Sequence, residues 1–343
     1  MKKLISCMTL IFVSFFAFSI LLKPDICIKA ALTGVMLCGN VIIPSIYPFS
    51  FCVIFINNSN AVNILKPLNP ITKFVFGLNY YEFSLFSLSL IGGYPLGAKL
   101  LNESKSHNAD LMLNYCINAG PAFIILAVGK GIFKSEAVGL VLFLSHILSS
   151  VIIAIFLRKK TVYEAPKQTK LTLNIVENFV ISASAAADTV IKICALVILF
   201  SCIGSYIEYF AHYFAPLKLL GLLCEVTNAV FKCNNILIVS FLLGFSGFSI
   251  WAQIFSLAKN IKINYIRFIF FRLLHGILSS LLTLTAIKLL KISVSTLSNN
   301  LTFSTKIFIS TPATALSLII MGIVLTISLS NKKYAGNLME DIV

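Results

Sequence analysis

Long runs of apolar residues, separated by Gly, Pro and charged positions, divide most of this chain into helical segments. The segments are predicted at residues 4–22, 30–57, 62–79, 83–101, 111–129, 136–157, 180–207, 217–230, 236–258, 267–290 and 307–329. Residues 62–79 are only weakly apolar, residues 217–230 are short, and Pro44 and Pro48 could split 30–57 into two pieces. Since a span needs roughly 20 apolar residues, we expect an all-α, polytopic transmembrane helix bundle of about eight to ten membrane segments.

Composition supports a membrane protein and excludes a soluble one. Only 11% of the residues are charged and 58% are hydrophobic, whereas soluble domains carry about 25% charged residues. The net charge of +15 comes from Lys and Arg in short loops between apolar runs. That is the positive-inside pattern of cytoplasmic loops, so we expect a lipid bilayer and no nucleic acid as partner. The location expected is a bacterial inner membrane.

The basic loop after the sixth segment divides the chain. Residues 158–172 hold five Lys or Arg residues against one acid, Glu164, which predicts a cytoplasmic linker. We expect an N-terminal anchor helix at 1–29, a first transport half at 30–157, a second half at 173–330 and a polar tail at 331–343. The second half counts consistently if 217–230 is re-entrant, because Lys259, Lys262 and Lys332 then all face the cytoplasm.

In the first half, the number of strong spans does not place both Lys2 and the basic loop at residue 158 on the cytoplasmic side. Three solutions stay open: residues 62–79 span the membrane, residues 30–57 form two elements, or one broken helix is re-entrant. Residues 1–22 could be a signal peptide, but the apolar run is long and no A-x-A-like site ends it. We therefore expect an uncleaved first helix.

Two related glycine-rich breaks carry the functional signal. Residues 90–101 read LIGGYPLGAKLL, and residues 244–255 read GFSGFSIWAQIF, with Gly93 over Gly247 at an offset of 154. Gly and Pro permit unwound backbone, which the hydrocarbon region tolerates only where protein or a water-filled cavity satisfies it. Paired interrupted helices in two halves are a pointer to a transporter binding site. The alternative for the first break is a packing kink with Lys99 at the interface.

A second pair of similar motifs supports an internal duplication, but at a different offset. Residues 146–150 read HILSS and residues 275–280 read HGILSS, about 129 apart. An extra segment near 111–135 would reconcile the offsets, giving two unequal repeat halves with broken or re-entrant helices.

Two further interruptions hold polar residues. Asn118 precedes Gly120 and Pro121, where a side-chain amide could reach a ligand, or where Pro121 merely kinks the helix. Glu225, in the short segment 217–230, is a candidate ion-coupling carboxylate because an intramembrane acid is a functional hypothesis by default. The alternative is an interfacial Glu at a helix end.

Catalytic and metal chemistry find no support in the sequence. The nine cysteines form no CxxC pair, and most lie in apolar runs, where Cys behaves as a small hydrophobe. His146 and His275 are interpreted as interhelical hydrogen-bonding groups, and Asp188 with Lys192 as an i,i+4 pair. We expect no enzyme activity, no catalytic residue, no metal and no cofactor.

Several motifs together resemble a known family: IPSIYPF (43–49), GGYPLGAKLL (92–101), NAGPAF (118–123), EVTN (225–228), GFSGFSIWAQ (244–253) and RLLHGILS (272–279). The chain resembles the YlbJ-type sporulation integral membrane proteins over roughly residues 30–330. These belong to the wider nucleoside-recognition, or Gate, domain group, which is similar to concentrative nucleoside transporters. The chain departs from that pattern at Ala119-Gly120, where a Ser-Asn type of pair is more usual.

The resemblance implies a sporulation-associated transporter in a forespore-surrounding membrane that moves dipicolinic acid, a small pyridine dicarboxylate. Helix N-termini exposed at breaks favour carboxylates, Lys99 could add a charged contact, and Tyr94, Phe248 or Trp251 could stack on the ring. The expected substrate-binding residues are Gly92, Gly93, Tyr94, Pro95, Lys99, Asn118, Gly120, Pro121, Thr227, Asn228, Ser246, Gly247, Ser249 and Gln253. The alternatives are a nucleoside or ion permease, and a non-transporting structural protein of the spore envelope. A homo-oligomer is compatible with all of them.

Overall fold

The computed structural model describes residues 2–104, 106–159 and 174–292, and over these residues the chain is helical with no strand. An all-α polytopic bundle is therefore confirmed. The helices are α1 (Lys2–Leu22), α2 (Pro24–Leu37), η1 (Cys38–Ile42), α3 (Ile43–Asn58), η2 (Asn60–Leu68), α4 (Asn69–Phe76), α5 (Tyr80–Gly92), α6 (Tyr94–Ser104), α7 (Ala109–Met112), η3 (Ala122–Ile132), α8 (Glu136–Phe156), α9 (Ile175–Phe210), α10 (Leu217–Cys224), α11 (Val226–Lys232), α12 (Ile236–Phe245), α13 (Gly247–Leu257) and α14 (Tyr265–Leu290). The predicted segment 307–329, the tail 331–343 and most of the linker lie outside the described residues.

Five helical stretches of the described chain are long and apolar enough to cross a membrane: Pro24–Asn58, Glu136–Phe156, Ile175–Phe210, Ile236–Leu257 and Tyr265–Leu290. A bent pair, Ala61–Phe76 and Tyr80–Gly92, meets at 80° and forms either a sixth, broken span or a re-entrant loop. The protein is thus a multi-pass membrane protein. The predicted segments 111–129 and 217–230 are short, interrupted helices in the structure.

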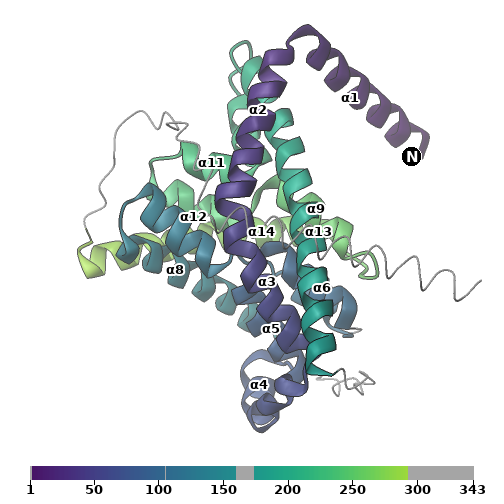
Figure 1. Cartoon of the computed structure of the whole chain (residues 1–343). Helices are drawn as coiled ribbons and strands as arrows, with labels where there is room; N and C mark the ends of the chain where they lie inside the picture. Colours follow the sequence, from purple (N-terminus) through teal and green to yellow (C-terminus); the bar gives the residue numbers. More distant parts are fainter. Residues whose placement is uncertain (1, 105, 160–173, 293–343) are drawn as a thin grey trace, which may run out of the picture.

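The longest helices lie side by side. The stretch α2–η1–α3 runs unbroken from Pro24 to Asn58 and packs along α9, as Figure 1 shows in purple and teal. Pro44 and Pro48 do not divide it, which removes one of the three solutions for the first half. The π-helical turn η1 precedes Pro44, and such turns let a helix accommodate an irregular position without ending.

Two broken helices occupy the middle of the bundle. Helices α5 and α6 are interrupted at Gly93, and helices α12 and α13 at Ser246–Gly247. Each pair follows a long helix and two short helical segments, and each is capped at its start by an Asn, Asn79 in one and Asn235 in the other. The order of elements therefore recurs along the chain, and the division into two transport halves stays a prediction.

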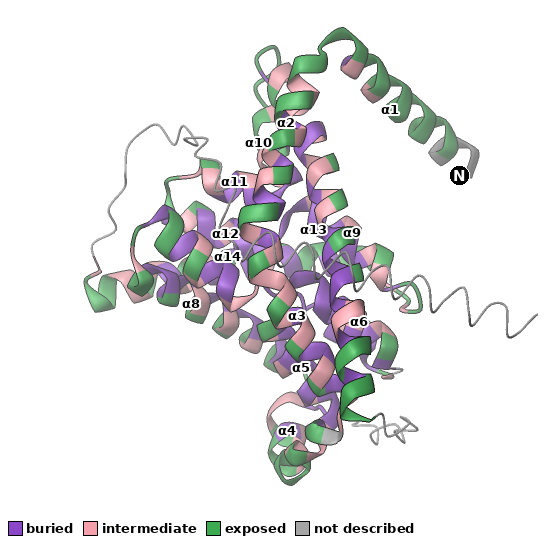
Figure 2. Cartoon of the chain, viewed as in Figure 1, coloured by how far each residue is buried: buried purple, intermediate pink, exposed green. Residues whose placement is uncertain are grey.

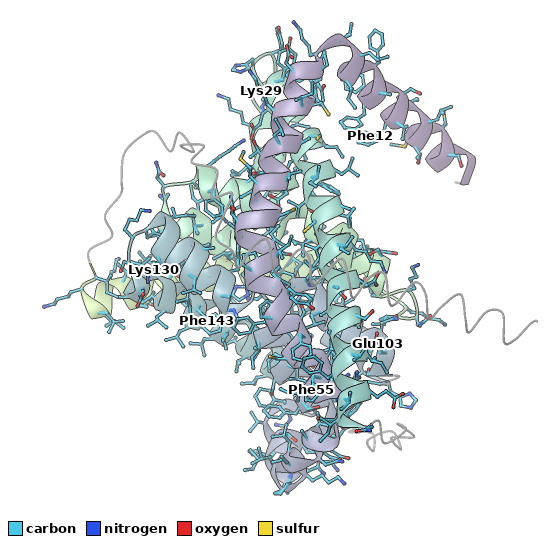
Figure 3. All side chains as sticks on the ribbon, viewed as in Figure 1. Phe12, Lys29, Phe55, Glu103, Lys130 and Phe143 are labelled. Atoms are coloured by element: carbon cyan, nitrogen blue, oxygen red, sulfur yellow. The ribbon has the colours of Figure 1, made fainter. Side chains whose placement is uncertain are left out.

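The core lies where these broken helices meet α8 and α14. Figure 2 shows the buried residues concentrated there, while α1 and the outer faces of α2 and α9 are largely exposed. Exposed Phe12 on α1 and the basic residues Lys29 and Lys130 lie at the edges of the molecule (Figure 3). Exposed apolar faces are what a helix needs in contact with lipid.

Candidate functional site

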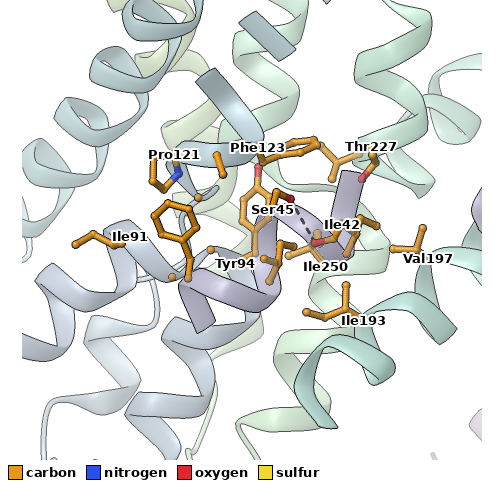
Figure 4. A pocket seen from close by; sticks show the side chains of 17 residues that line it. Ile42, Ser45, Ile91, Tyr94, Pro121, Phe123, Ile193, Val197, Thr227 and Ile250 are labelled. Atoms are coloured by element: carbon orange, nitrogen blue, oxygen red, sulfur yellow. Dashed lines mark hydrogen bonds between the residues drawn. The ribbon is translucent and has the colours of Figure 1, made fainter. Parts of the chain in front are cut away.

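A small pocket of about 30 Å³ lies where three of the predicted breaks converge. Its lining residues are Ile42, Ser45, Ile46, Phe49, Ile91, Gly92, Gly93, Tyr94, Gly120, Pro121, Ala122, Phe123, Ile193, Val197, Val226, Thr227 and Ile250 (Figure 4). The long helices supply one wall through η1–α3 and α9, and the interrupted segments supply the other. In this conformation the open space is about 30 Å³, enough for roughly one or two water molecules, so a larger solute requires the walls to move apart.

Gly93 and Gly120 bring the break between α5 and α6 into contact with the break at residues 118–121. Gly93 adopts φ +89°, a conformation that side chains rarely allow, and separates α5 from α6. A methyl group on Gly120 would lie 3.6 Å from the Gly93 backbone and 3.4 Å from the carbonyl of Ile91. The unwound backbone at the two breaks therefore forms a continuous part of the pocket wall.

Four helices begin at this pocket. Helix α6 starts at Tyr94, η3 at Ala122 and α11 at Val226, all of which line the pocket or directly adjoin it. Helix α13 contributes Ile250 from its first turn. A helix start leaves backbone N–H groups without intrahelical partners and carries a partial positive charge. The pocket lining holds no charged side chain, and the starts of α6, η3 and α13 add partial positive charge beside it. At α11 the Glu225 carboxylate already accepts the first free N–H groups.

Aromatic side chains supply much of the remaining wall. Tyr94, Phe49 and Phe123 line the pocket, and Figure 4 shows Tyr94 beside Pro121 and Phe123 near Thr227. The Tyr94 hydroxyl is committed elsewhere, donating a 2.7 Å hydrogen bond to the carbonyl of Leu243 in α12. The lining therefore combines flat aromatic faces with helix starts that favour anionic groups.

Glu225 lies at the interruption between α10 and α11. It ends α10 in an extended conformation and caps α11, its carboxylate accepting hydrogen bonds from the N–H groups of Thr227 at 3.1 Å and Asn228 at 2.6 Å. The side chain is 2% exposed. Asn228 in turn donates to the hydroxyl of Ser201 in α9 at 2.7 Å. Glu225 is thus buried within the protein at the junction of α10 and α11, and its role in ion coupling stays a prediction.

The structure brings some predicted site residues together and separates others. Six of them line the pocket: Gly92, Gly93, Tyr94, Gly120, Pro121 and Thr227. Lys99 instead lies one turn and more beyond the break, where its ammonium donates to the carbonyl of Ala185 at 3.2 Å and to Thr189 at 3.1 Å in α9. Its role in the structure is to join α6 to α9.

The other predicted residues lie around the pocket without lining it. Pro95 sits in the first turn of α6, and Asn118 donates to the carbonyl of Tyr115 at 2.8 Å. At the break between α12 and α13, Ser246 donates to the carbonyl of Phe245. Further along α13, Gln253 donates to Ser249 at 3.4 Å. Gly247, at φ +77°, allows the turn between α12 and α13 and contacts the end of α10. Phe248 and Trp251 pack against Phe245 in an aromatic cluster outside the pocket.

Sequence reasoning did not single out the residue that holds this arrangement together. Arg272 in α14 is fully buried, and its guanidinium donates to the carbonyls of Ile117 and Asn114 at 2.7 Å each. Further contacts reach the carbonyl of Gly244 at 3.4 Å and Nδ1 of His275 at 3.0 Å. An Arg within an apolar run was a visible signal, because such a charge is costly unless it is paired inside the bundle.

Arg272 and its neighbours satisfy the non-helical loop at 113–120. The backbone N–H of Ala119 donates to Nε2 of His146 at 3.0 Å, and Ser150 donates to the carbonyl of Tyr115 at 2.6 Å. The His146 and His275 rings stack at 4.5 Å, and His275 contacts the carbonyl of His146 at 3.0 Å. Both histidines therefore act as interhelical hydrogen-bonding groups, one from each half of the predicted repeat.

Comparison with known proteins gives one informative similarity. The chain is 24% identical over 329 residues to the sporulation integral membrane protein YlbJ of Bacillus subtilis strain 168, covering 78% of this chain and 80% of that protein. No family model matches the chain. No solved structure matches it significantly. The similarity supports the YlbJ-type resemblance, whereas membership of the nucleoside-recognition group stays a prediction.

Proposed function

We propose that this protein is a sporulation-associated membrane transporter that carries a small anionic solute, with dipicolinic acid as the first candidate, across a forespore membrane. The observation that carries the proposal is that three helices, α6, η3 and α13, start beside one pocket whose lining holds no charged side chain. Half-helix N-termini aimed at an anionic substrate are a recurring design of secondary transporters. The similarity to a sporulation integral membrane protein supports the biological setting.

The pocket suits an aromatic dicarboxylate better than a highly hydrated ion. Its apolar and aromatic walls would contact the ring, and backbone N–H groups at the helix starts would receive the carboxylates. Affinity in this account comes from backbone dipoles and not from Lys99. Transport would proceed by alternating access, since interrupted helices provide the hinges that such motion requires.

The test is ligand-dependent stabilisation of the purified full-length protein in nanodiscs. The ligands compared are dipicolinate, its neutral isostere dipicolinamide, and uridine. A ligand at a hundred times its Kd stabilises the native state by about 2.7 kcal/mol, so dipicolinate should raise the thermal midpoint and dipicolinamide should not. Stabilisation by uridine alone would favour a nucleoside permease. No stabilisation by any of the three would favour a structural envelope protein.

A further inference from the structure

A second, smaller pocket of about 20 Å³ adjoins the first along α9. Where the solute pocket meets Ile193 and Val197, this one meets Ser201, Ser205 and Glu208, further along the same helix. Glu225 and Asn228 form its other wall, together with Gly221 and Leu222 at the end of α10. In contrast to the apolar solute pocket, most of these groups present oxygen atoms.

The charges at this second pocket favour a cation. Lys232 is the only cationic side chain in its lining, and it is already bound to both carboxylate oxygens of Glu208, at 2.7 Å each. Glu225 takes part in none of the four ion pairs between described residues. Each of its oxygens accepts one backbone N–H, and a carboxylate oxygen has capacity for a further partner.

The end of helix α10 also favours a cation at the second pocket. Helix α10 ends at Cys224, and no capping N–H closes its last turn at Glu225. The final carbonyls of a helix lack intrahelical partners and carry partial negative charge. Ser201 donates its proton to the carbonyl of Val197 at 2.7 Å and accepts the Asn228 amide N–H at 2.7 Å, so its oxygen keeps one lone pair for a further partner.

We propose that this second pocket binds a small monovalent cation through the Glu225 carboxylate, the Ser201 and Ser205 hydroxyls, the Asn228 amide oxygen and the terminal carbonyls of α10. Transporters coordinate such ions with side-chain oxygens and with the carbonyls of helix C-terminal ends. The two neighbouring pockets then have opposite polarity: helix starts surround the solute, and a helix end with an acid surrounds the ion.

One short segment links the two sites. In residues 225–228, Val226 and Thr227 line the solute pocket while Glu225 and Asn228 line the ion pocket. A methyl group on Gly247 would lie 3.0 Å from the carbonyl of Leu223 and 3.3 Å from the N–H of Val226, so the second broken helix packs directly on this segment. Cation binding therefore sets the position of a solute-pocket wall. Only this coupling rests on the proposed function; the ion site does not.

Trp251 is the only tryptophan of the chain and lies on the broken helix that packs against this segment. Full-length protein in nanodiscs, free of solute, is titrated with NaCl or KCl against choline chloride at constant ionic strength, while Trp251 fluorescence is followed. We expect a saturable change with an alkali cation and none with choline. Glu225→Gln should raise the half-saturating concentration by about tenfold or more, since a charged ligand is lost.

Two further variants and a direct measurement secure the interpretation. Ser201→Ala should weaken binding severalfold, and Asp188→Asn, a change of an exposed carboxylate on the same helix, should leave it unaltered. Binding of radioactive sodium to each variant confirms the fluorescence result and also covers a variant whose fluorescence is silent. Equal responses to sodium, potassium and choline would overturn the proposal, as would wild-type sodium affinity in Glu225→Gln and Ser201→Ala. A response to pH alone would overturn it in favour of a proton.

Discussion

The hydroxyl of Tyr94 donates a 2.7 Å hydrogen bond to the backbone carbonyl of Leu243. Tyr94 is the first residue of α6, and Leu243 lies in the last turn of α12, so the bond joins the two broken helices immediately beside their interruptions. Both groups are buried. The pairing of breaks noted in the sequence thus corresponds to a physical contact in the fold.

Tyr94→Phe removes this bond and keeps the ring in the pocket. Loss of one buried hydrogen bond should cost about 1 kcal/mol of stability, and it should also weaken dipicolinate binding because two pocket-forming segments are no longer joined. Tyr206→Phe is the matched control, since its hydroxyl makes an equivalent 2.9 Å bond to the carbonyl of Lys23 away from the pocket. Thermal unfolding and dipicolinate titration should therefore separate the two variants. Equal effects on dipicolinate affinity would contradict this role.

The approach of α6 to the 113–120 loop predicts intolerance at Gly97. A methyl group there would overlap the carbonyl oxygen of Cys116, a backbone atom that has no rotamer to change. Such overpacking costs about 1–3 kcal/mol or more, so Gly97→Ala should sharply reduce the yield of folded protein. Gly39→Ala, where nothing lies within 4 Å, should fold normally. The measurement is monodispersity on size-exclusion chromatography, and normal Gly97→Ala protein would disprove the packing.

Arg272 should be required for folding rather than for solute contact. Arg272→Met leaves the carbonyls of Ile117 and Asn114 without their donor, and each buried acceptor left unsatisfied costs about 1–3 kcal/mol. Arg267→Met is the control, because that arginine forms a partly exposed ion pair with Asp110, worth at most about 1 kcal/mol. We expect Arg272→Met to lose cooperative thermal unfolding and Arg267→Met to retain it. Similar melting of both variants would argue against the buried network.

Substitution of Lys99 should change the stability of the protein without changing its affinity for dipicolinate. Lys99→Met removes two hydrogen bonds to α9, and bonds from a charged donor contribute about 1.5–3 kcal/mol each. We expect a lower thermal midpoint with unchanged dipicolinate affinity. The opposite result, a tenfold loss of affinity at an unchanged midpoint, would restore Lys99 as a solute contact and would show that the pocket extends to it.

The spans were predictable where the apolar runs are continuous. Residues 136–157 and 267–290 correspond to α8 and α14 within two residues, because Ser135 and Asn264 cap their starts as polar N-cap residues do. The break at Gly93 was predictable for a similar reason, since only glycine readily adopts its positive φ. Such local signals depend on nearby residues alone.

What could not be predicted depends on distant partners. The loop at 113–120 resembles an ordinary proline kink in sequence, and only Arg272, His146 and Ser150 from two other helices allow its backbone to stay unwound. The sequence left open whether Pro44 and Pro48 divide residues 30–57, and the helix stays continuous there because a π-helical turn precedes Pro44. Whether Lys99 faced the solute or α9 likewise depended on a contact 86 residues away.

The most direct test is to fill the pocket with a larger side chain and to measure the uptake of radiolabelled dipicolinate into proteoliposomes. Val197 is 1% exposed and lines the pocket, whereas Leu199 on the same helix is 44% exposed on the outer face. If the breaks surround a solute site, Val197→Phe should abolish saturable uptake and Leu199→Phe should leave it at the wild-type level. Wild-type uptake by Val197→Phe, or no uptake by the wild-type protein itself, would contradict the central claim.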